Sequence, residues 1–310
     1  MLRYLGLRFA LSIPALIAVT LVTFFIGYFA PGDPVTDMLG PRATQEAVTR
    51  LRAEYGLDRP PLVQYWSFLS NLMHGDLGLS YRFRGRPVNE IIAEGLSVTA
   101  QLGLLALFVA ILLGIPAGIV AALNRGRPLD YLTMSVALAL ISVPAFVLAP
   151  VLILLLAVKH PWLPVGGWGD PIQLVMPAFV LGSRPAGLLA RMMRSSMLEV
   201  LNQDYIRTAR AKGLRERVVI LRHALRNALL PVVTVLANSF GYLVTGSFII
   251  ETIYDIPGIG RIGIESIFRR DYPVIEATVL LMAVTFVLVN LAADLIYGLL
   301  DPRVRVGARA

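Results

Sequence analysis

The sequence contains no cysteine and only three histidines. Without cysteine the chain can form no disulfide, hold no metal through thiolates and use no cysteine nucleophile. His74, His160 and His223 lie far apart and show no ligand spacing, so we expect no metal site. The sequence also lacks a GxxxxGK[ST] phosphate-binding loop, and we therefore expect neither an ATPase site nor any cofactor bound by this chain.

Charged residues are scarce as well. Asp, Glu, Lys and Arg make up 15% of the chain, hydrophobic residues 56%, and the mean hydropathy is +0.71. These values are far from those of a soluble globular domain. The apolar runs are about 20 residues long, which suits helices that cross a hydrocarbon core of about 30 Å. The sequence therefore predicts an all-α integral membrane protein with the lipid bilayer as its main partner.

A net charge of +8 is compatible in principle with nucleic-acid binding. The basic residues, however, lie beside apolar spans and do not form an independent polar face. We expect no nucleic-acid partner.

About six apolar segments are long enough to cross a membrane. The expected helices are Phe9–Phe29, Thr99–Leu123, Tyr131–Val158, Leu174–Met193, Leu229–Ile250 and Ala277–Leu300. The first looks like a secretory signal, but it is longer than the usual apolar region of about 7–15 residues. Cleavage after Ala30 would also place Tyr28, which is not small, at the third position back. We therefore expect a retained first helix.

The basic residues predict the orientation of the chain. Six helices place both termini on one side, and the positive-inside rule makes that side cytoplasmic. The residues on that face are Arg3, Arg8, Arg125, Arg127, the cluster from Arg191 to Arg226, Arg303, Arg305 and Arg309. The expected organisation is an N-terminal helix (1–30), an extracytoplasmic connector (31–98), a core with five spans (99–301) and a cytoplasmic tail (302–310).

Prolines within the spans predict kinks or broken helices. They are Pro14, Pro116, Pro144, Pro177 and Pro185. A moving pathway and ordinary packing both account for them. The glycines of PGIGRIG (257–263) match GxGxxG, but they follow a membrane span and not a strand, so a tight turn is expected there and no nucleotide site.

The most strongly basic stretch runs from Asp204 to Thr234. Residues 204–212 suit a helix, Gly213 can end or bend it, and 215–228 suit a second helix. These basic residues can simply reflect the positive-inside rule or contact anionic lipid head groups. Its density between two apolar spans also fits a docking segment.

This stretch carries a resemblance to a known family. DYIRTARAKGL (204–214) followed by HALRNALLPVVT (223–234) resembles the cytoplasmic coupling loop of permease subunits in bacterial ABC importers for dipeptides and oligopeptides. The long connector resembles that of the subunit type with a long loop after the first helix. Further similar motifs occur in the same order: PGDP (31–34), YGLD (55–58), GDLGLS (75–80), RSSMLEV (194–200), PGIGR (257–261) and RDYPV (270–274).

The resemblance implies a type I ABC importer permease fold with a coupling helix at about 204–228. It implies a transport subunit without its own ATPase site, in the bacterial inner membrane. The implied partners are a second homologous permease, two ATP-binding subunits that use ATP and Mg, an extracytoplasmic peptide-binding protein and the peptide itself.

The resemblance also assigns residues within the loop. Ala209 and Gly213 would form the tight core of the coupling turn. The polar residues that would make contacts or stabilise the segment are Asp204, Arg207, Arg210, Lys212, His223 and Arg226. The general importer motif has Glu-Ala-Ala where this chain has Arg207-Thr208-Ala209, so the role of the glutamate does not transfer.

Arg184 is a candidate for the substrate pathway, because an ionised side chain within a span is costly unless it faces water or a partner. It could meet a peptide carboxylate, or it could snorkel to an interface or pair with an acid. Two other functions stay open: the same machinery importing nickel chelates or glutathione, and a self-sufficient secondary transporter. The last usually shows inverted repeats and paired intramembrane carboxylates, and neither is evident in the sequence.

Overall fold

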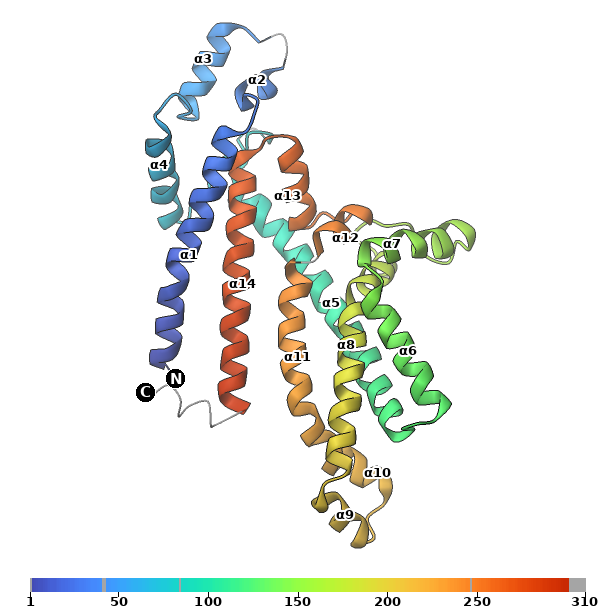
Figure 1. The fold of residues 1–310 in the computed structure, drawn as a ribbon. Helices are drawn as coiled ribbons and strands as arrows, with labels where there is room; N and C mark the ends of the chain where they lie inside the picture. The colour runs from blue at the N-terminus through green and yellow to red at the C-terminus, as the bar shows by residue number, and fades with distance from the viewer. Residues whose placement is uncertain (1, 41–42, 84, 246, 301–310) are drawn as a thin grey trace. The chain divides into compact units, whose positions relative to one another are not determined.

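The computed structural model describes residues 2–40, 43–83, 85–245 and 247–300, and the predicted tail at 302–310 lies outside this range. The described chain is helical, apart from turns, loops and one isolated bridge between Leu79 and Pro87 (Figure 1). It divides into two compact units, one built on residues 100–256 and the other on residues 5–99 and 257–287.

Five helical segments of the described residues are long and apolar enough to cross a membrane: Leu11–Phe29, Val88–Leu123, Pro171–Leu201, Glu216–Ser239 and Tyr272–Leu291. A sixth candidate is a bent pair, Pro128–Ser142 with Ala145–Lys159. Each of the six predicted spans overlaps one of these segments. The prediction of an all-helical membrane protein is therefore confirmed, although the helix ends differ by several residues.

The third span departs from expectation because it is not one helix. α6 (Pro128–Ser142) and the following α7 (Ala145–Ile153) and η1 (Leu154–Lys159) meet at an angle of 104°. Pro144 has no N–H to donate, and it forces Val143 out of the helical region to φ −79° and ψ 120°. The restriction that proline places on the backbone thus predicted a kink or break at Pro144. The segment itself, however, was predicted as one continuous span.

α8 (Val175–Leu201) is the most buried of the candidate spans, with 61% of its most apolar window inside the protein. It packs against α5 (Val88–Leu123), α6 and α11 (Leu225–Thr245). Small residues allow this close approach. A Cβ added at Gly182 would lie 2.5 Å from the carbonyl oxygen of Ala106 in α5, and one at Gly187 would lie 2.5 Å from that of Ala137 in α6.

The predicted connector forms three helices: α2 (Pro34–Leu39), α3 (Gln45–Glu54) and α4 (Pro61–Met73). α4 lies beside α1 (Leu2–Phe29) (Figure 1). The Tyr65 hydroxyl is 3.1 Å from the Thr20 hydroxyl, and the rings of Tyr65 and Phe24 are 5.3 Å apart. The connector is therefore an ordered part of its unit.

A second anchor joins the connector to the segment between α13 (Ile259–Phe268) and α14 (Tyr272–Leu300). The buried Asp271 carboxylate accepts hydrogen bonds from the Ser80 hydroxyl at 2.5 Å, the Tyr81 amide at 3.0 Å and the Arg82 amide at 3.3 Å. Arg82 also pairs with Glu265 of α13 at 3.1 Å. The pKa of Glu265 is lowered, mainly because Arg261 donates a hydrogen bond to it.

The glycines of PGIGRIG open α13, and the chain before them forms α12 (Ser247–Ile253). Gly258 caps α13, and the Ile259 amide donates to the Thr99 hydroxyl at 2.9 Å. The segment is therefore a turn into a helix, preceded by a helix, and it lacks the strand of a dinucleotide site.

Candidate functional site

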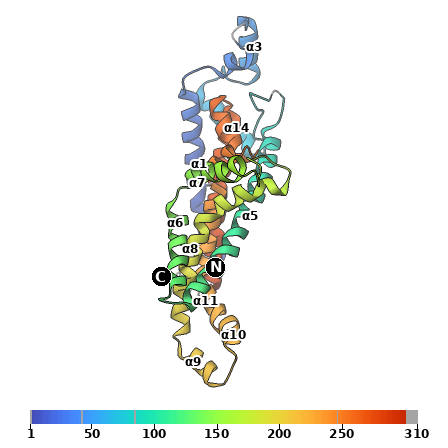
Figure 2. The ribbon, with the colours of Figure 1, turned by 90° about the vertical axis from the view of Figure 1, so that its right-hand side faces the viewer.

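The predicted coupling loop lies between α8 and α11. It consists of α9 (Asp204–Ala211), α10 (Glu216–Val218) and η3 (Val219–Ala224), a single π-helical turn that leads into α11. Figures 1 and 2 both show α9 and α10 beyond the adjoining ends of α8 and α11. The two helices separated by Gly213 are as the sequence predicted, except that the second contains this π-helical turn.

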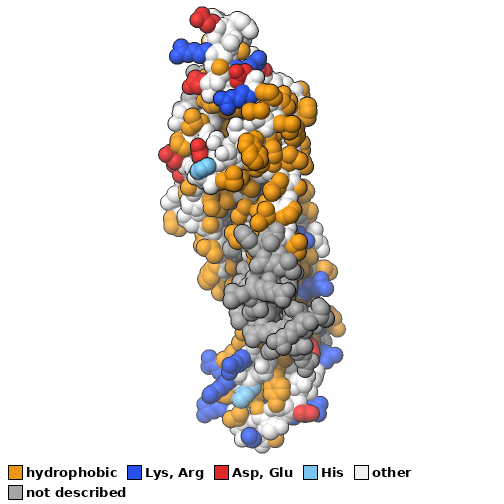
Figure 3. All heavy atoms as spheres, turned by 90° about the vertical axis from the view of Figure 1, so that its left-hand side faces the viewer, with side chains coloured by type: hydrophobic (Ala, Val, Ile, Leu, Met, Phe, Trp, Pro, Cys, Tyr) orange, Lys and Arg blue, Asp and Glu red, His pale blue; other side chains and the backbone are white. Residues whose placement is uncertain are grey.

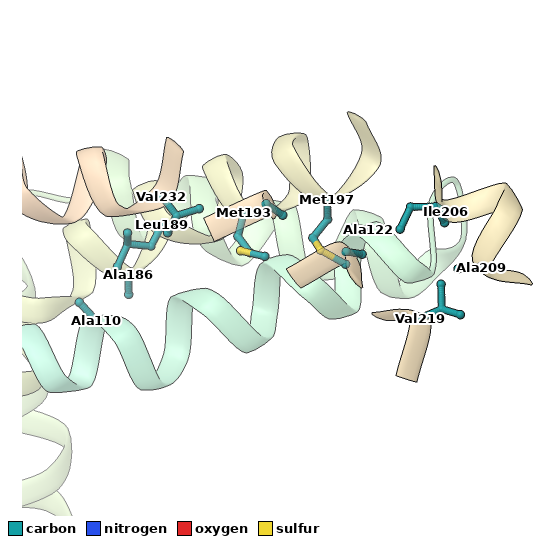
Figure 4. Close-up of a cluster of buried hydrophobic side chains, with 12 residues drawn as sticks. Ala110, Ala122, Ala186, Leu189, Met193, Met197, Ile206, Ala209, Val219 and Val232 are labelled. Carbon is teal, nitrogen blue, oxygen red and sulfur yellow. The ribbon is translucent and has the colours of Figure 1, made fainter. Parts of the chain in front are cut away.

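An apolar face holds α9 against the rest of its unit. Ile206 is fully buried and Ala209 is 6% exposed, while their neighbours Arg207 and Thr208 are exposed. Both join a buried cluster with side chains of α5, α8, η3 and α11. Figure 4 shows this cluster, in which the labelled members are Ala110, Ala122, Ala186, Leu189, Met193, Met197, Ile206, Ala209, Val219 and Val232. The cluster connects the loop directly to the interior packing of α8.

The turn after α9 depends on glycine. Lys212 caps the helix, its amide bonded to the Thr208 carbonyl at 3.0 Å, and the Gly213 amide donates to the Arg210 carbonyl at 2.9 Å. Gly213 has φ +75°, a conformation that costs other L-residues roughly 1–2 kcal/mol. A Cβ there would meet no atom within 4 Å, so glycine is favoured by the backbone conformation and not by a lack of space.

Two polar contacts close the loop. The Arg210 guanidinium donates to Glu216 at 2.7 and 3.1 Å, which raises the pKa of Arg210 and joins the two sides of the turn. The Asn227 side chain donates to the Tyr205 hydroxyl at 2.8 Å, linking α9 to the start of α11. Arg210 was predicted as a site residue, whereas Tyr205, Glu216 and Asn227 were not.

Most of the remaining predicted residues lie on the outer side of the loop. Asp204 and Arg207 form an exposed pair at 3.3 Å, Lys212 and Arg226 are exposed, and His223 is partly buried. Figure 3 shows Lys and Arg side chains gathered on one face around the end that carries α9 and α10. The loop thus has an apolar side within the protein and a basic side open to a partner.

A buried ion pair fixes α8 close to the loop. Arg194 donates two hydrogen bonds to Asp130 of α6, at 2.7 and 2.8 Å. The Asp130 side chain is 3% exposed, and it also accepts from the Gly126 amide at 3.0 Å. Such a bidentate pair fixes geometry as well as charge. No local sequence pattern predicts this pair, because 64 residues separate the partners.

Arg184 is not part of this constellation. It is an exposed residue of α8, between the buried Ser183 and Pro185. The helix rises about 26 Å from Arg184 to the end of α8 at Leu201. Any role of Arg184 is therefore separate from that of the loop.

Comparison with known proteins identifies the family. Residues 114–306 match the model of the binding-protein-dependent transport system inner membrane component, and residues 1–102 match the N-terminal model of the same kind of protein. The chain belongs to this family. It is an inner-membrane permease subunit of an ABC importer.

Similar relatives match the permease along nearly its whole length. The glutathione transport system permease protein GsiC of Escherichia coli is 41% identical over 305 residues, covering 98% of this chain and 99% of that protein. The dipeptide transport system permease protein DppB of Bacillus subtilis is 42% identical over 307 residues, covering 99% of each.

Two solved structures share the fold of the permease. One is the MetNI methionine ABC transporter in an inward-facing conformation, with a TM-score of 0.58, 20% identity and coverage of 68% of this chain and 96% of that chain. The other is an amino acid ABC transporter with histidines, with a TM-score of 0.53, 16% identity and coverage of 74% and 96%. The predicted type I ABC importer permease fold is confirmed.

Proposed function

We propose that the permease forms the transmembrane channel of an importer for short peptides, together with a second homologous permease. Two ATP-binding subunits would use ATP and Mg, and an extracytoplasmic binding protein would deliver the peptide. The full-length similarity to a dipeptide permease and a glutathione permease carries this proposal, since glutathione is itself a tripeptide. Competition of radiolabelled dipeptide uptake by tripeptides, glutathione and nickel chelates tests it; inhibition by nickel chelates alone would overturn it.

The proposed orientation follows the sequence. Both termini and the loop at 204–228 face the cytoplasm, residues 31–98 form the extracytoplasmic connector, and 99–301 form the core with the tail at 302–310. The basic residues around α9 and α10 support it, because cytoplasmic loops are enriched in Lys and Arg.

We further propose that α9 and the turn after it transmit closure of the ATP-binding subunits to the helices. Ile206 and Ala209 lie against the cluster that contains Met193 and Met197 of α8, so a displacement of α9 changes the packing of a central helix. The exposed residues Asp204, Arg207, Lys212 and Arg226 are available to the ATP-binding subunits. His223 would support the segment from within.

Ala209→Leu should uncouple the importer. A larger side chain at this buried position pushes α9 away from α8. We expect the two permeases to co-purify, while ATP-driven uptake in proteoliposomes falls at least tenfold. The control is Ala139→Leu, the same change at an exposed position of α6. Normal uptake by the Ala209 variant, with full recovery of the ATP-binding subunits, would refute the coupling role.

Arg184 is proposed to contact the carboxylate of the cargo along the pathway. Its exposure on an otherwise buried stretch of α8 supports this. A hydrogen bond between charged groups is worth about 1.5–3 kcal/mol, so Arg184→Gln should raise the KM for peptide uptake roughly tenfold or more. Arg184→Lys should recover part of the loss. Unchanged affinity and rate in the Gln variant would show that Arg184 has no contact with the cargo.

A further inference from the structure

The unit built on residues 5–99 and 257–287 contains a cavity of about 300 Å³. Its walls come from α1, from the end of α3 and the loop after it, from α4, from the loop before α5 and from the start of α14. Small-molecule sites in proteins begin at about this volume. The cavity is distinct from the coupling loop, which belongs to the other unit.

The cavity is lined by more acidic than basic side chains. Glu54, Asp76 and Glu276 line it, together with one guanidinium, that of Arg59. Asp76 is held in place because its carboxylate accepts from the Gly78 amide at 2.8 Å. A concave site with several carboxylates and low-dielectric walls concentrates cations.

A carboxylate on α14 lacks a partner in this site. Glu276 lines the cavity, and the structure records no hydrogen bond or ion pair to its carboxylate within the described part of the chain. A carboxylate that is partly removed from water is usually paired or hydrogen-bonded, because leaving it unpaired is costly.

Aromatic rings complete the wall. Tyr55 and Tyr81 both line the cavity and meet edge to face, with centroids 5.1 Å apart. Phe24 and Phe68 also line it. Aromatic faces attract cations such as ammonium groups. Carboxylates and aromatic rings around one cavity both favour a cationic ligand.

We propose that this cavity binds a small molecule through a protonated primary amine, with Glu276 as the counter-ion. An ammonium has three donors and no acceptor, and a carboxylate has only acceptors, so the two groups match. Two sources carry this group: the N-terminus of a short peptide, which rests on the proposed function, and a free aliphatic amine, which does not.

The lack of cysteine allows a direct test on the assembled transporter. Ser67 lines the cavity, so Ser67→Cys places a single thiol of this chain there. Its reaction with a thiosulfonate reagent bearing an ammonium is compared with that of one bearing a sulfonate. Thr49→Cys, at an exposed position of α3 that does not line the cavity, gives the control ratio. We expect the ammonium-to-sulfonate rate ratio to be roughly tenfold higher at position 67.

Substitution of Glu276 tests whether its carboxylate causes the preference for the ammonium reagent. In the Ser67→Cys background, with the reactions run at about pH 9 so that the carboxyl group at position 276 is ionised, Glu276→Gln should reduce the ratio several-fold toward the control, whereas Glu276→Asp should retain it. Equal ratios at positions 67 and 49, or a ratio unaffected by Glu276→Gln, would overturn the proposal.

Protection of the Ser67→Cys thiol then identifies the source of the amine. Dialanine, N-acetyl-dialanine and 1,4-diaminobutane are the probes. Protection by dialanine but not by its acetylated form indicates a peptide N-terminus, and protection by the diamine alone indicates an aliphatic amine. Protection by none, or equally by the acetylated form, would contradict recognition through an ammonium. The rate ratios do not depend on the cargo, so failure of peptide uptake leaves this test intact.

Discussion

Gly118→Ala is expected to prevent the permease from accumulating as a folded protein. A Cβ at this position would lie 2.5 Å from both the Ala190 carbonyl oxygen and the Met193 Cβ, and 3.1 Å from the Arg194 amide nitrogen. Backbone atoms cannot move aside as a flexible side chain can, so α5 and α8 would have to separate. Overpacking of this kind costs about 1–3 kcal/mol and sometimes more. The yield of monodisperse transporter and its thermal unfolding midpoint measure the effect.

Gly103→Ala is the matched control. Gly103 lies in the same helix, and a Cβ there would meet no atom within 4 Å. Alanine in a helix interior is favoured over glycine by roughly 0.5–1 kcal/mol, so this variant should keep or slightly raise the unfolding midpoint. Equal losses in the two variants would mean that helix–helix contact at Gly118 does not determine stability.

Arg194→Ala should destabilise the permease at least as strongly. It would leave the Asp130 carboxylate, whose side chain is 3% exposed, without its charged partner. Removing one partner of a buried pair costs about 3–5 kcal/mol. Because the Arg194 side chain is 30% exposed, we expect the lower end of that range. The measurement is again the unfolding midpoint of the purified transporter.

Two further variants distinguish the effect of an unpaired buried charge from general destabilisation by mutation. Asp130→Asn combined with Arg194→Gln removes both charges, and the double variant should be more stable than Arg194→Ala alone, because no unpaired charge remains. Arg207→Ala breaks an exposed pair with Asp204 and should leave the midpoint unchanged. If Arg207→Ala is as harmful as Arg194→Ala, charge burial is not the cause.

Much of the fold could be predicted from the sequence, because apolar length and period carry the signal for membrane helices. Pro144 marked the place where the third segment breaks, as the restriction on Val143 requires. The angle of the break could not be predicted, since nothing local determines how the chain continues. The contacts that hold the connector at Tyr65 and Asp271 could not be predicted, because they join residues far apart in the chain.

The position of the candidate loop in the chain could be predicted from the sequence, but most of the contacts within the loop could not. The family motif pointed to Ala209 and Gly213, and the structure supplies separate physical reasons for each: burial at Ala209 and a positive φ at Gly213. An apolar residue at 206 followed by a small one at 209 gave a helical spacing that could have marked the inner face of α9. No local signal pairs Arg210 with Glu216 or Tyr205 with Asn227, because only the folded turn brings them together.

The sharp bend after α6 affects the surrounding lipid. At about 1.5 Å per residue, the 15 residues of α6 extend about 22 Å, whereas hydrocarbon chains span about 30 Å. With a bend of 104°, α7 and η1 cannot continue in the direction of α6 to make up the difference. Beside α6 the hydrophobic mismatch is thus about 8 Å. We expect this shortfall to be met by thinning of the bilayer at this flank or by the apolar surface of a neighbouring subunit in place of lipid.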